Sequence, residues 1–246
     1  MRSIILIMVA VMGVSIVAHA GERMEEKFDS TKVIWKKRTR EKVIAITIDD
    51  CYNVGLVRKA MREAARRNVK LTFFPTGDAV KSAPGLWREV RAAGHEIELH
   101  TQTHHSMETL SEDGQFEQYR KNIDAVRAAV GQDIRFRFVR PPGGCGVFGY
   151  ECQGGCMPSY RRSVERLSRY NGAHIDIAMW GGDSLFVRGH ATGSAYVLEY
   201  FERELMPGKI FLYHTRAADM AVLGEMIDYA IKRGYHLGSL KELMEL

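Results

Sequence analysis

Short apolar runs alternate with longer amphipathic stretches along most of this 246-residue chain, and this alternation restricts the fold more than any other feature. The apolar runs have the length and β-branched content of buried strands, whereas the longer stretches repeat their apolar residues at helical spacing. The predicted strands are 43–48, 69–74, 95–100, 134–140, 173–180, 209–214 and 235–240. The predicted helices are 54–67, 83–94, 111–131, 159–171, 194–205 and 221–234. Repeated βα units predict one α/β domain with a parallel sheet, either open or closed into a barrel.

Polar side chains occur where the predicted strands end. The first strand stops at two adjacent carboxylates, although aspartate is disfavoured in strands. The residues at or just beyond strand ends are Asp49, Asp50, His100, Arg140, Asp183 and His214. A turn would explain the two adjacent aspartates but not the other residues of the set. In α/β barrels and open α/β sheets, ligands bind at the carboxyl ends of the strands, so the whole set predicts a functional site.

The segment HTQTH separates His100 and His104 by four residues. If the chain turns helical after the strand, these residues share one face and both imidazoles reach one ion. With one carboxylate they make a three-ligand site with open positions, which fits catalytic zinc and also fits the Fe(II) oxygenases. Only one of the adjacent aspartates is comfortably a ligand, so the other is placed to remove a proton from water. We interpret His105 as a surface residue and His95 as a packing or capping residue.

The first twenty residues have the pattern of a secretory signal peptide. They contain one arginine, an apolar stretch over residues 4–18, and two small residues, Ala18 and Ala20, around His19. The apolar stretch is shorter than the roughly 20 residues of a membrane span, although an uncleaved anchor is the alternative. We therefore predict a secreted or cell-envelope protein with no stable membrane insertion after signal cleavage.

Residues 21–40 form a basic lead-in that is typical of a solvated segment. Removal of residues 1–20 takes away one arginine and no acid, which leaves 34 basic and 30 acidic residues and a net charge of +4. This charge mildly favours anionic surfaces such as cell-wall polymers. The basic residues form no stripe interleaved with aromatics, so we expect no nucleic-acid partner.

Cysteine usage favours disulfides. An even number in an exported protein is typical of disulfide bonding, and the second CxxC pair of a common zinc knot is missing. The four cysteines are Cys51, Cys145, Cys152 and Cys156. Three of them crowd into residues 145–156, which predicts a stapled loop, and three pairings of the four remain open.

Five short motifs carry a family resemblance. They are TIDD (47–50), HTQTH (100–104), RPPGG (140–144), WGGD (180–183) and FLYH (211–214). Their order and spacing resemble those of the polysaccharide deacetylases, the NodB-like enzymes of carbohydrate esterase family four. The resemblance covers roughly residues 41–245, so we assign 41–246 as a single catalytic domain. It implies an α/β fold of the distorted (β/α) barrel type.

The resemblance also implies a role for the motif residues. Asp49 takes the place of the catalytic base, and Arg140 matches the residue whose positive charge pairs with that base. His214 matches the general acid that protonates the departing amine. The implied ligands of Zn²⁺, or of another divalent transition metal, are Asp50, His100 and His104. Thr101 suits a hydrogen bond that orients this cluster.

Two further motifs are implied to handle substrate. The backbone N–H at Gly143 matches the oxyanion donor of the third motif. Trp180 and Asp183 match the fourth motif, as a groove-lining residue and a catalytic residue.

The chain departs from the family pattern at several positions. Cys51 replaces the usual glycine after the acid pair, and Gly143 replaces an aromatic residue that forms one groove wall. The Asp-Trp pair of the fourth motif falls on Phe186 and Val187. That missing acid tunes the general acid, so we expect Asp183 or Asp176 to replace it. A Cys51–Cys145 disulfide would tie two loops of the site together.

We expect a secreted metal-dependent hydrolase that removes N-acetyl groups from an amino-sugar polysaccharide, such as peptidoglycan or a chitin-like glycan. An O-acetyl esterase is a close variant. The alternative is a non-catalytic cell-wall glycan-binding protein that keeps the deacetylase fold. An Fe(II) oxygenase is disfavoured by the second acid, the export signal and the βα alternation.

Overall fold

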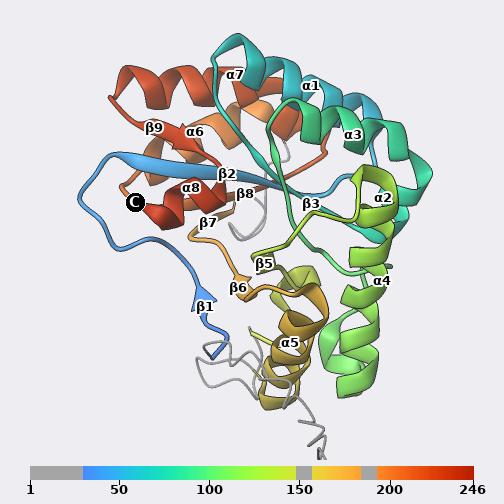
Figure 1. Ribbon diagram of the computed structural model, residues 1–246. Coiled ribbons are helices and arrows are strands. Elements are labelled where there is room, and N and C mark those ends of the chain that lie inside the picture. The colour runs from blue at the N-terminus through green and yellow to red at the C-terminus, as the bar shows by residue number, and fades with distance from the viewer. Residues whose placement is uncertain (1–29, 148–156, 184–192) are drawn as a thin grey trace, which may run out of the picture.

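The computed structural model describes residues 30–147, 157–183 and 193–246 (Figure 1). The predicted signal peptide and the first part of the lead-in lie outside the described residues. So do Cys152, Cys156, Phe186 and Val187. Within the described ranges, no helix is both long and apolar enough to cross a membrane.

The strands form two parallel sheets. Their bounds are β1 (Val33–Ile34), β2 (Val43–Asp50), β3 (Thr72–Pro75), β4 (Glu96–Ile97), β5 (Phe138–Val139), β6 (Asp176–Ala178), β7 (Gly182–Asp183), β8 (Ile210–His214) and β9 (His236–Gly238). The larger sheet has the order β4-β3-β2-β8-β7, with β9 also paired to β2, and the smaller sheet has the order β1-β6-β5. Each ladder between these strands is parallel, as the βα alternation predicts.

Two contacts join the sheets into a distorted barrel. A parallel bridge between Leu99 and Val139 connects the chain after β4 to β5. On the other side, Lys36 bridges to Lys209 just before β8, and the N–H of Lys37 donates to the carbonyl of Gly208 at 2.8 Å. These bonds close the order β8-β2-β3-β4-β5-β6-β1 into a ring, with β7 paired to β8 beside it. The predicted single-domain barrel is confirmed.

Helices cover the outside of the barrel. Their bounds are α1 (Val54–Arg66), α2 (Gly77–Ser82), α3 (Pro84–Ala92), α4 (Glu112–Val130), α5 (Pro158–Asn171), α6 (Ser194–Glu204), α7 (Ala217–Lys232) and α8 (Leu240–Glu245), with short 3₁₀ turns η1 (Met107–Thr109) and η2 (Pro142–Gly144). In Figure 1, α1, α3 and α7 lie on one side of the strands, and α5 lies beside β5 and β6. Because β2 packs against both the helices and the barrel interior, every residue from 43 to 49 is buried.

Capping residues explain where the main helices begin. Asn53 accepts the N–H of Leu56 at the start of α1, and Ser111 accepts the N–H of Gly114 at the start of α4. Pro84 occupies the first turn of α3, where its missing N–H has no cost. The predicted helices at these positions are confirmed to within a few residues.

The ladders of β4, β5 and β6 are shorter than the predicted strands. Between β4 and β5 the ladder is short because of Glu98. Its carboxylate accepts the N–H groups of Arg137 and Phe138 at 3.0 and 2.9 Å. A side chain therefore takes the place of backbone pairing at that point. The strand β1 was not expected at all, since two residues carry too little pattern to be recognised.

Candidate active site

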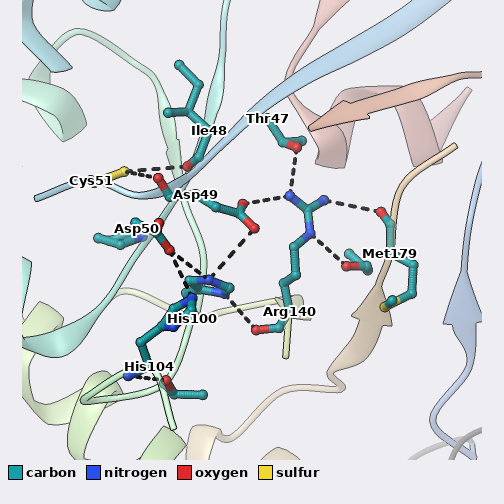
Figure 2. Close-up of polar contacts among 12 residues, drawn as sticks. Thr47, Ile48, Asp49, Asp50, Cys51, His100, His104, Arg140 and Met179 are labelled. Atoms are coloured by element: carbon teal, nitrogen blue, oxygen red, sulfur yellow. Dashed lines mark hydrogen bonds and ion pairs between the residues drawn. The ribbon is translucent and has the colours of Figure 1, made fainter. Parts of the chain in front are cut away.

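The adjacent aspartates at the end of β2 face different partners (Figure 2). In a regular strand, neighbouring side chains point to opposite faces, which would separate the two carboxylates. Asp50 and Cys51 instead have φ angles of 63° and 64°, in the left-handed region. Such a conformation costs about 1–3 kcal/mol for each residue, so the surrounding fold must hold it. The turn leaves Asp49 facing Arg140 while Asp50 faces the histidines.

Asp50, His100 and His104 converge on one point. The Oδ1 atom of Asp50 lies 3.2 Å from the Nε2 atoms of both histidines, and the three candidate ligand atoms lie within 4.8 Å of one another. This Oδ1 atom is buried, and its contacts with the two histidines do not have the geometry of hydrogen bonds. Although burial opposes ionisation, the contacts with His100 and His104 lower the pKa of Asp50 below its ordinary value. The donor set therefore fits a divalent metal ion.

Hydrogen bonds orient the ring of His100. Its Nδ1–H donates to the carbonyl of Arg140 at 2.9 Å, so in the neutral ring the lone pair lies on Nε2, the nitrogen that faces Asp50. Its backbone N–H donates to Oδ1 of Asn122 at 2.9 Å. Burial opposes protonation, but Asp49 and Asp50 raise the pKa of His100. These carboxylates favour positive charge at this point of the molecule.

A loop, and not a helical turn, brings His104 to the cluster. Residues 101–106 have no helical structure, and both Thr101 and His104 have positive φ angles, of 66° and 58°. The hydroxyl of Thr101 accepts the backbone N–H of His104 at 3.0 Å, which holds the loop closed. The ring centroids of His100 and His104 are 5.1 Å apart. The expected convergence of the imidazoles is found, but the helical reason for it was wrong.

Arg140 lies behind Asp49 and is completely buried. Its Nη1 donates to Oδ1 of Asp49 and to the hydroxyl of Thr47, each at 2.7 Å. Its remaining nitrogens donate to the carbonyls of Ala178 and Met179 at 2.9 and 3.2 Å. Burial lowers the pKa of Arg140, and Asp49 opposes this effect. The guanidinium therefore fixes the position of the Asp49 carboxylate (Figure 2).

His214 ends β8 and is the register partner of Asp49 across the sheet. Its backbone N–H donates to Oδ2 of Asp219 at 3.0 Å. Asp219 is fully buried in the first turn of α7, and burial raises its pKa. The Nδ1 atom of His214 and the Oδ1 atom of Asp219 are both buried without a hydrogen bond to protein. We did not anticipate Asp219, because an acid in the first turn of a helix is common for reasons of the helix dipole.

The site residues line one pocket of about 270 Å³. Its lining consists of Asp49, Asp50, His100, His104, Gly143, Trp180, Asp183, Leu212 and His214. The selected motif residues are therefore in the wall, apart from Arg140, which supports Asp49 from behind, and Thr101, which holds the loop of His104. Asn122 was also missed, although an asparagine on the apolar face of α4 is a signal for a buried polar contact.

The two candidates for the acid beside His214 lie in different places. Asp183 is 4% exposed and shares the pocket with His214. Asp176 instead accepts the N–H of Lys32 at 2.7 Å and contacts the ring of His174 at 2.9 Å. These contacts hold Asp176 away from the pocket lining, so the expectation for Asp176 was wrong.

The expected Cys51–Cys145 disulfide is absent, since both residues are free thiols. Cys51 is buried, and its Sγ lies 3.4 Å from the carbonyl of Ile48 in its own turn. Burial, with help from Asp49, raises the pKa of the Cys51 thiol well above its ordinary value. The predicted stapled loop lies mostly outside the described residues.

The two histidines that we interpreted as non-ligands have the expected surroundings. His105 is exposed and contacts the hydroxyl of Thr103. His95 is buried, and its ring packs edge-on against Phe73 with the centroids 5.6 Å apart. Burial lowers the pKa of His95 to about 4. Both interpretations are confirmed.

The sequence pattern of the polysaccharide deacetylases matches residues 36–147. The peptidoglycan-N-acetylmuramic acid deacetylase PdaA of Bacillus subtilis is 27% identical over 233 residues, which cover 92% of this chain and 80% of that protein. The expected resemblance of this chain to the polysaccharide deacetylase family is confirmed. An uncharacterised 30.6 kDa protein of Geobacillus stearothermophilus is also 27% identical, over 230 residues that cover 92% of this chain and 79% of that protein.

Solved structures of family 4 carbohydrate esterases share the fold of this protein. The structure of Bacillus subtilis PdaA, a family 4 carbohydrate esterase, has a TM-score of 0.71 and 25% identity, with coverage of 87% of this chain and 85% of that chain. A family 4 pseudoenzyme from Bacillus anthracis has a TM-score of 0.74 and 23% identity, with coverage of 87% and 69%. The barrel is therefore shared by active and inactive relatives, so the site itself must carry the functional conclusion.

Proposed function

We propose that this protein is a metal-dependent N-deacetylase of an amino-sugar glycan in the cell envelope. One observation carries the proposal: a candidate base, a three-ligand cluster and a candidate general acid all line the same 270 Å³ pocket. The relatives support the substrate class, since PdaA is named for its action on peptidoglycan. The signal-peptide pattern of residues 1–20 supports export to that compartment.

Asp50, His100 and His104 would hold the metal ion, for which we propose zinc. A bound zinc ion would supply Lewis acidity, which polarises a carbonyl and lowers the pKa of water toward about 7. Two histidines and one carboxylate are a common ligand set of catalytic zinc and leave positions open. The candidate ligand atoms converge, and the buried Oδ1 of Asp50 has no other hydrogen bond to protein.

Asp49 is the proposed general base. Its Oδ1 is held by Arg140 at 2.7 Å, which leaves Oδ2, at 3.8 Å from Nε2 of His100, on the side of the cluster. A water molecule at the cluster would give its proton to this oxygen while it attacks the acetamide carbon. The hydrogen bond from Arg140 holds the Asp49 carboxyl group in place during this transfer, so the base does not have to reorient.

His214 is the proposed general acid. It ends the strand next to Asp49 and lines the pocket, so acid and base approach the scissile amide from neighbouring strands. Its imidazole would protonate the sugar nitrogen as the C–N bond breaks and acetate leaves. Gly143 lines the same pocket, and its backbone N–H is the proposed donor to the oxyanion. Asp183, on β7, is proposed to replace the missing acid of the fourth motif that tunes the general acid.

A glycan-binding protein without turnover is the second candidate. A pseudoenzyme with this fold exists in Bacillus anthracis, so the fold alone does not separate the two functions. The simultaneous presence of Asp49, Arg140 and His214 around the cluster favours the enzyme, because a binding protein needs neither a held base nor an acid.

Acetate release tests the proposal. The purified protein without residues 1–20 is incubated with N-acetylated glycans, including peptidoglycan and chitin oligomers, with zinc and with a chelator. We expect acetate with zinc and none with chelator, and the bound metal is identified by elemental analysis. A folded, zinc-loaded protein that releases no acetate from any glycan would favour the binding function.

A further inference from the structure

Exposed basic side chains from two segments gather at one end of the barrel. The first segment, residues 36–42, leads into β2, and the second, residues 232–236, joins α7 to β9, so both lie where strands begin (Figure 1). In a barrel of parallel strands this end lies opposite to the carboxyl ends that form the site. We call the exposed cations of the two segments the basic face, and they are Lys36, Arg38, Arg40, Lys42, Lys232 and Arg233.

Direct contacts hold the two segments side by side. The Nζ of Lys42 donates to the carbonyl of Arg233 at 3.0 Å and lies 5.8 Å from the ring centroid of Tyr235. The backbone N–H of His236 donates to the carbonyl of Lys42 at 2.8 Å. Residues that are 191 positions apart in the chain therefore present their charges on one surface.

The charge of the basic face is not compensated by ion pairs. Among the described residues, every ion pair involves side chains other than these six. By contrast, the exposed Arg162 of α5 is paired with Glu112 at 2.8 Å. Lys37 is turned aside, since its Nζ donates to the carbonyl of Met244 at 3.0 Å, and Glu41 is the one acid of the two segments. Six positive charges therefore face one negative charge, which favours an anionic partner.

The lining of the catalytic pocket has the opposite character. Its acids are Asp49, Asp50 and Asp183, and no lysine or arginine belongs to the described lining. The strand β2 links the two ends, because Lys42 precedes it and the two adjacent aspartates end it, over eight residues or roughly 25 Å. An anionic surface therefore attracts the end with the basic face and does not attract the end with the pocket, which orients the molecule.

An extended anionic surface suits this face better than a small anion does. Six cations spread over two segments match a surface that carries many charges, and clusters of about four to eight Lys and Arg are typical of segments that bind anionic lipids. The signal-peptide pattern of residues 1–20 predicts export through a membrane, so a lipid surface is the first that the exported protein meets.

We propose that the basic face holds the protein against an anionic lipid surface, by charge attraction and without insertion, while the catalytic pocket faces away from the lipid and toward the glycan. The inference relies on export and not on turnover, so it goes beyond the proposed deacetylase function and is tested separately from it. Each Lys or Arg close to an anionic lipid surface strengthens binding by about fivefold.

Vesicle co-sedimentation tests the proposal. The protein without residues 1–20 is mixed with vesicles of phosphatidylglycerol and phosphatidylcholine in equal parts, or of phosphatidylcholine alone. We expect binding to the anionic vesicles only, and we expect this binding to be lost at about 1 M salt, where the Debye length is about 3 Å. The double variant Arg38→Gln with Arg40→Gln removes two charges from the basic face and is expected to weaken binding by about 25-fold.

A second double variant is the matched control. Arg162→Gln with Arg166→Gln also removes two positive charges, but it removes them from exposed ion pairs of α5 with Glu112 and Asp113. This control is expected to change the vesicle affinity by less than about twofold. Equal losses in the two double variants would overturn the proposal, because net charge and not the basic face would then explain the binding.

The second segment of the basic face gives an independent test. If the Arg38 and Arg40 double variant does not fold, as judged by circular dichroism, Lys232→Gln with Arg233→Gln removes two charges from the same face. Equal binding to both kinds of vesicle would overturn the proposal, and so would an absence of binding at low salt. In the latter case, binding of a soluble glycerol-phosphate polymer would assign the basic face to a wall polymer.

Acetate release separates this inference from the proposed function. With zinc and soluble glycan oligomers, vesicle-bound and free protein should release acetate at the same rate, because the pocket lies at the opposite end of β2. Release that stops when the protein binds vesicles would overturn the proposed orientation. Charge-dependent vesicle binding without acetate in either state would count against the deacetylase and leave the lipid-binding face standing.

Discussion

Two pairs of acidic side chains lie inside this barrel, and they differ in what surrounds them. Asp49 and Asp50, at the carboxyl end of β2, face Arg140 and the imidazoles of the cluster. Glu96 and Glu98, on and just after β4, face backbone N–H groups, a hydroxyl and each other. Both pairs are largely shielded from water, so burial alone does not distinguish them.

The neighbouring charges decide the ionisation of each pair. Burial raises the pKa of Glu98 well above its ordinary value, and the charge of Glu96 adds to this effect. Burial also raises the pKa of Glu96. At Asp50 the imidazoles overcome burial and lower the pKa. A buried acid is therefore ionised and available for catalysis only where the fold also supplies a positive partner.

The glutamate pair connects elements of the barrel and has no place in the pocket. Glu98 accepts the N–H groups at the start of β5, while Glu96 accepts the hydroxyl of Thr72 at 2.6 Å and the N–H of Lys241 at 3.1 Å. The pair thus joins β4 to β3, β5 and α8. We interpret it as structural, and the following substitutions test this contrast.

Asp49→Asn is expected to have the largest effect. Loss of a general base lowers kcat by about 10²–10⁴-fold, and the isosteric amide keeps the shape of the pocket. Acetate release per folded protein is the measurement. Asp176→Asn, in an ion pair outside the pocket lining, and Glu98→Gln are controls that retain turnover. Full turnover by Asp49→Asn would show that Asp49 is not the general base.

Arg140→Met tests the positive partner itself. Removal of one member of a buried ion pair is expected to lower the free energy of unfolding by about 3–5 kcal/mol, because Asp49 then remains buried without its counter-charge. Urea denaturation measures the change. Arg137→Met, which breaks a partly exposed pair with Glu245, is the matched control and should cost about 0–1 kcal/mol. Equal losses for the two arginines would show that burial of the pair does not matter.

Zinc is expected to stabilise the end of the barrel that holds the aspartates. A ligand present at about 100 times its Kd raises the free energy of unfolding by about 2.7 kcal/mol. Thermal denaturation with zinc and with chelator measures this shift. His104→Ala should abolish it, whereas His105→Ala, at the exposed neighbouring position, should retain it. A shift that survives His104→Ala would place the metal elsewhere.

The glutamate pair is expected to give the smallest effect, as a pH dependence of stability. An acid whose folded pKa is raised keeps its proton longer in the folded state, so stability is full below the ordinary pKa of 4.5 and falls as the pH rises toward the folded pKa. The slope is at most about 1.4 kcal/mol per pH unit for each such group, and it applies only between the ordinary and the folded pKa. Glu98→Gln should make the slope shallower and raise stability at pH 8 by about 1–2 kcal/mol.

Urea denaturation between pH 4 and 8 measures this dependence. Glu202→Gln, at an exposed position of α6, is the control and should leave the profile unchanged. An identical slope in wild type and Glu98→Gln would show that Glu98 is not the acid responsible.

Much of the site was predictable because it depends on strand order and strand ends. Parallel strands place their carboxyl ends at one edge, so Asp49, His100 and His214 had to meet wherever the exact pairing lay. The members of the cluster followed from ligand chemistry and the family motifs. Local backbone conformation was not predictable in the same way. The left-handed turns at Asp50 and His104 leave no signal in the residue pattern, and the contact of Asn122 with His100 joins segments far apart in the chain.

The sequence by itself determined the βα order, the apolar strands and the residues that end them, because these depend on local periodicity and residue type. Only the tertiary structure decided that Cys51 is a buried free thiol, that β1 joins the barrel and that Asp219 contacts His214. The first two depend on contacts between segments far apart in the chain, and the third depends on the path of the turn between β8 and α7. Such contacts leave no periodic signal, since two or three residues are too few to show one.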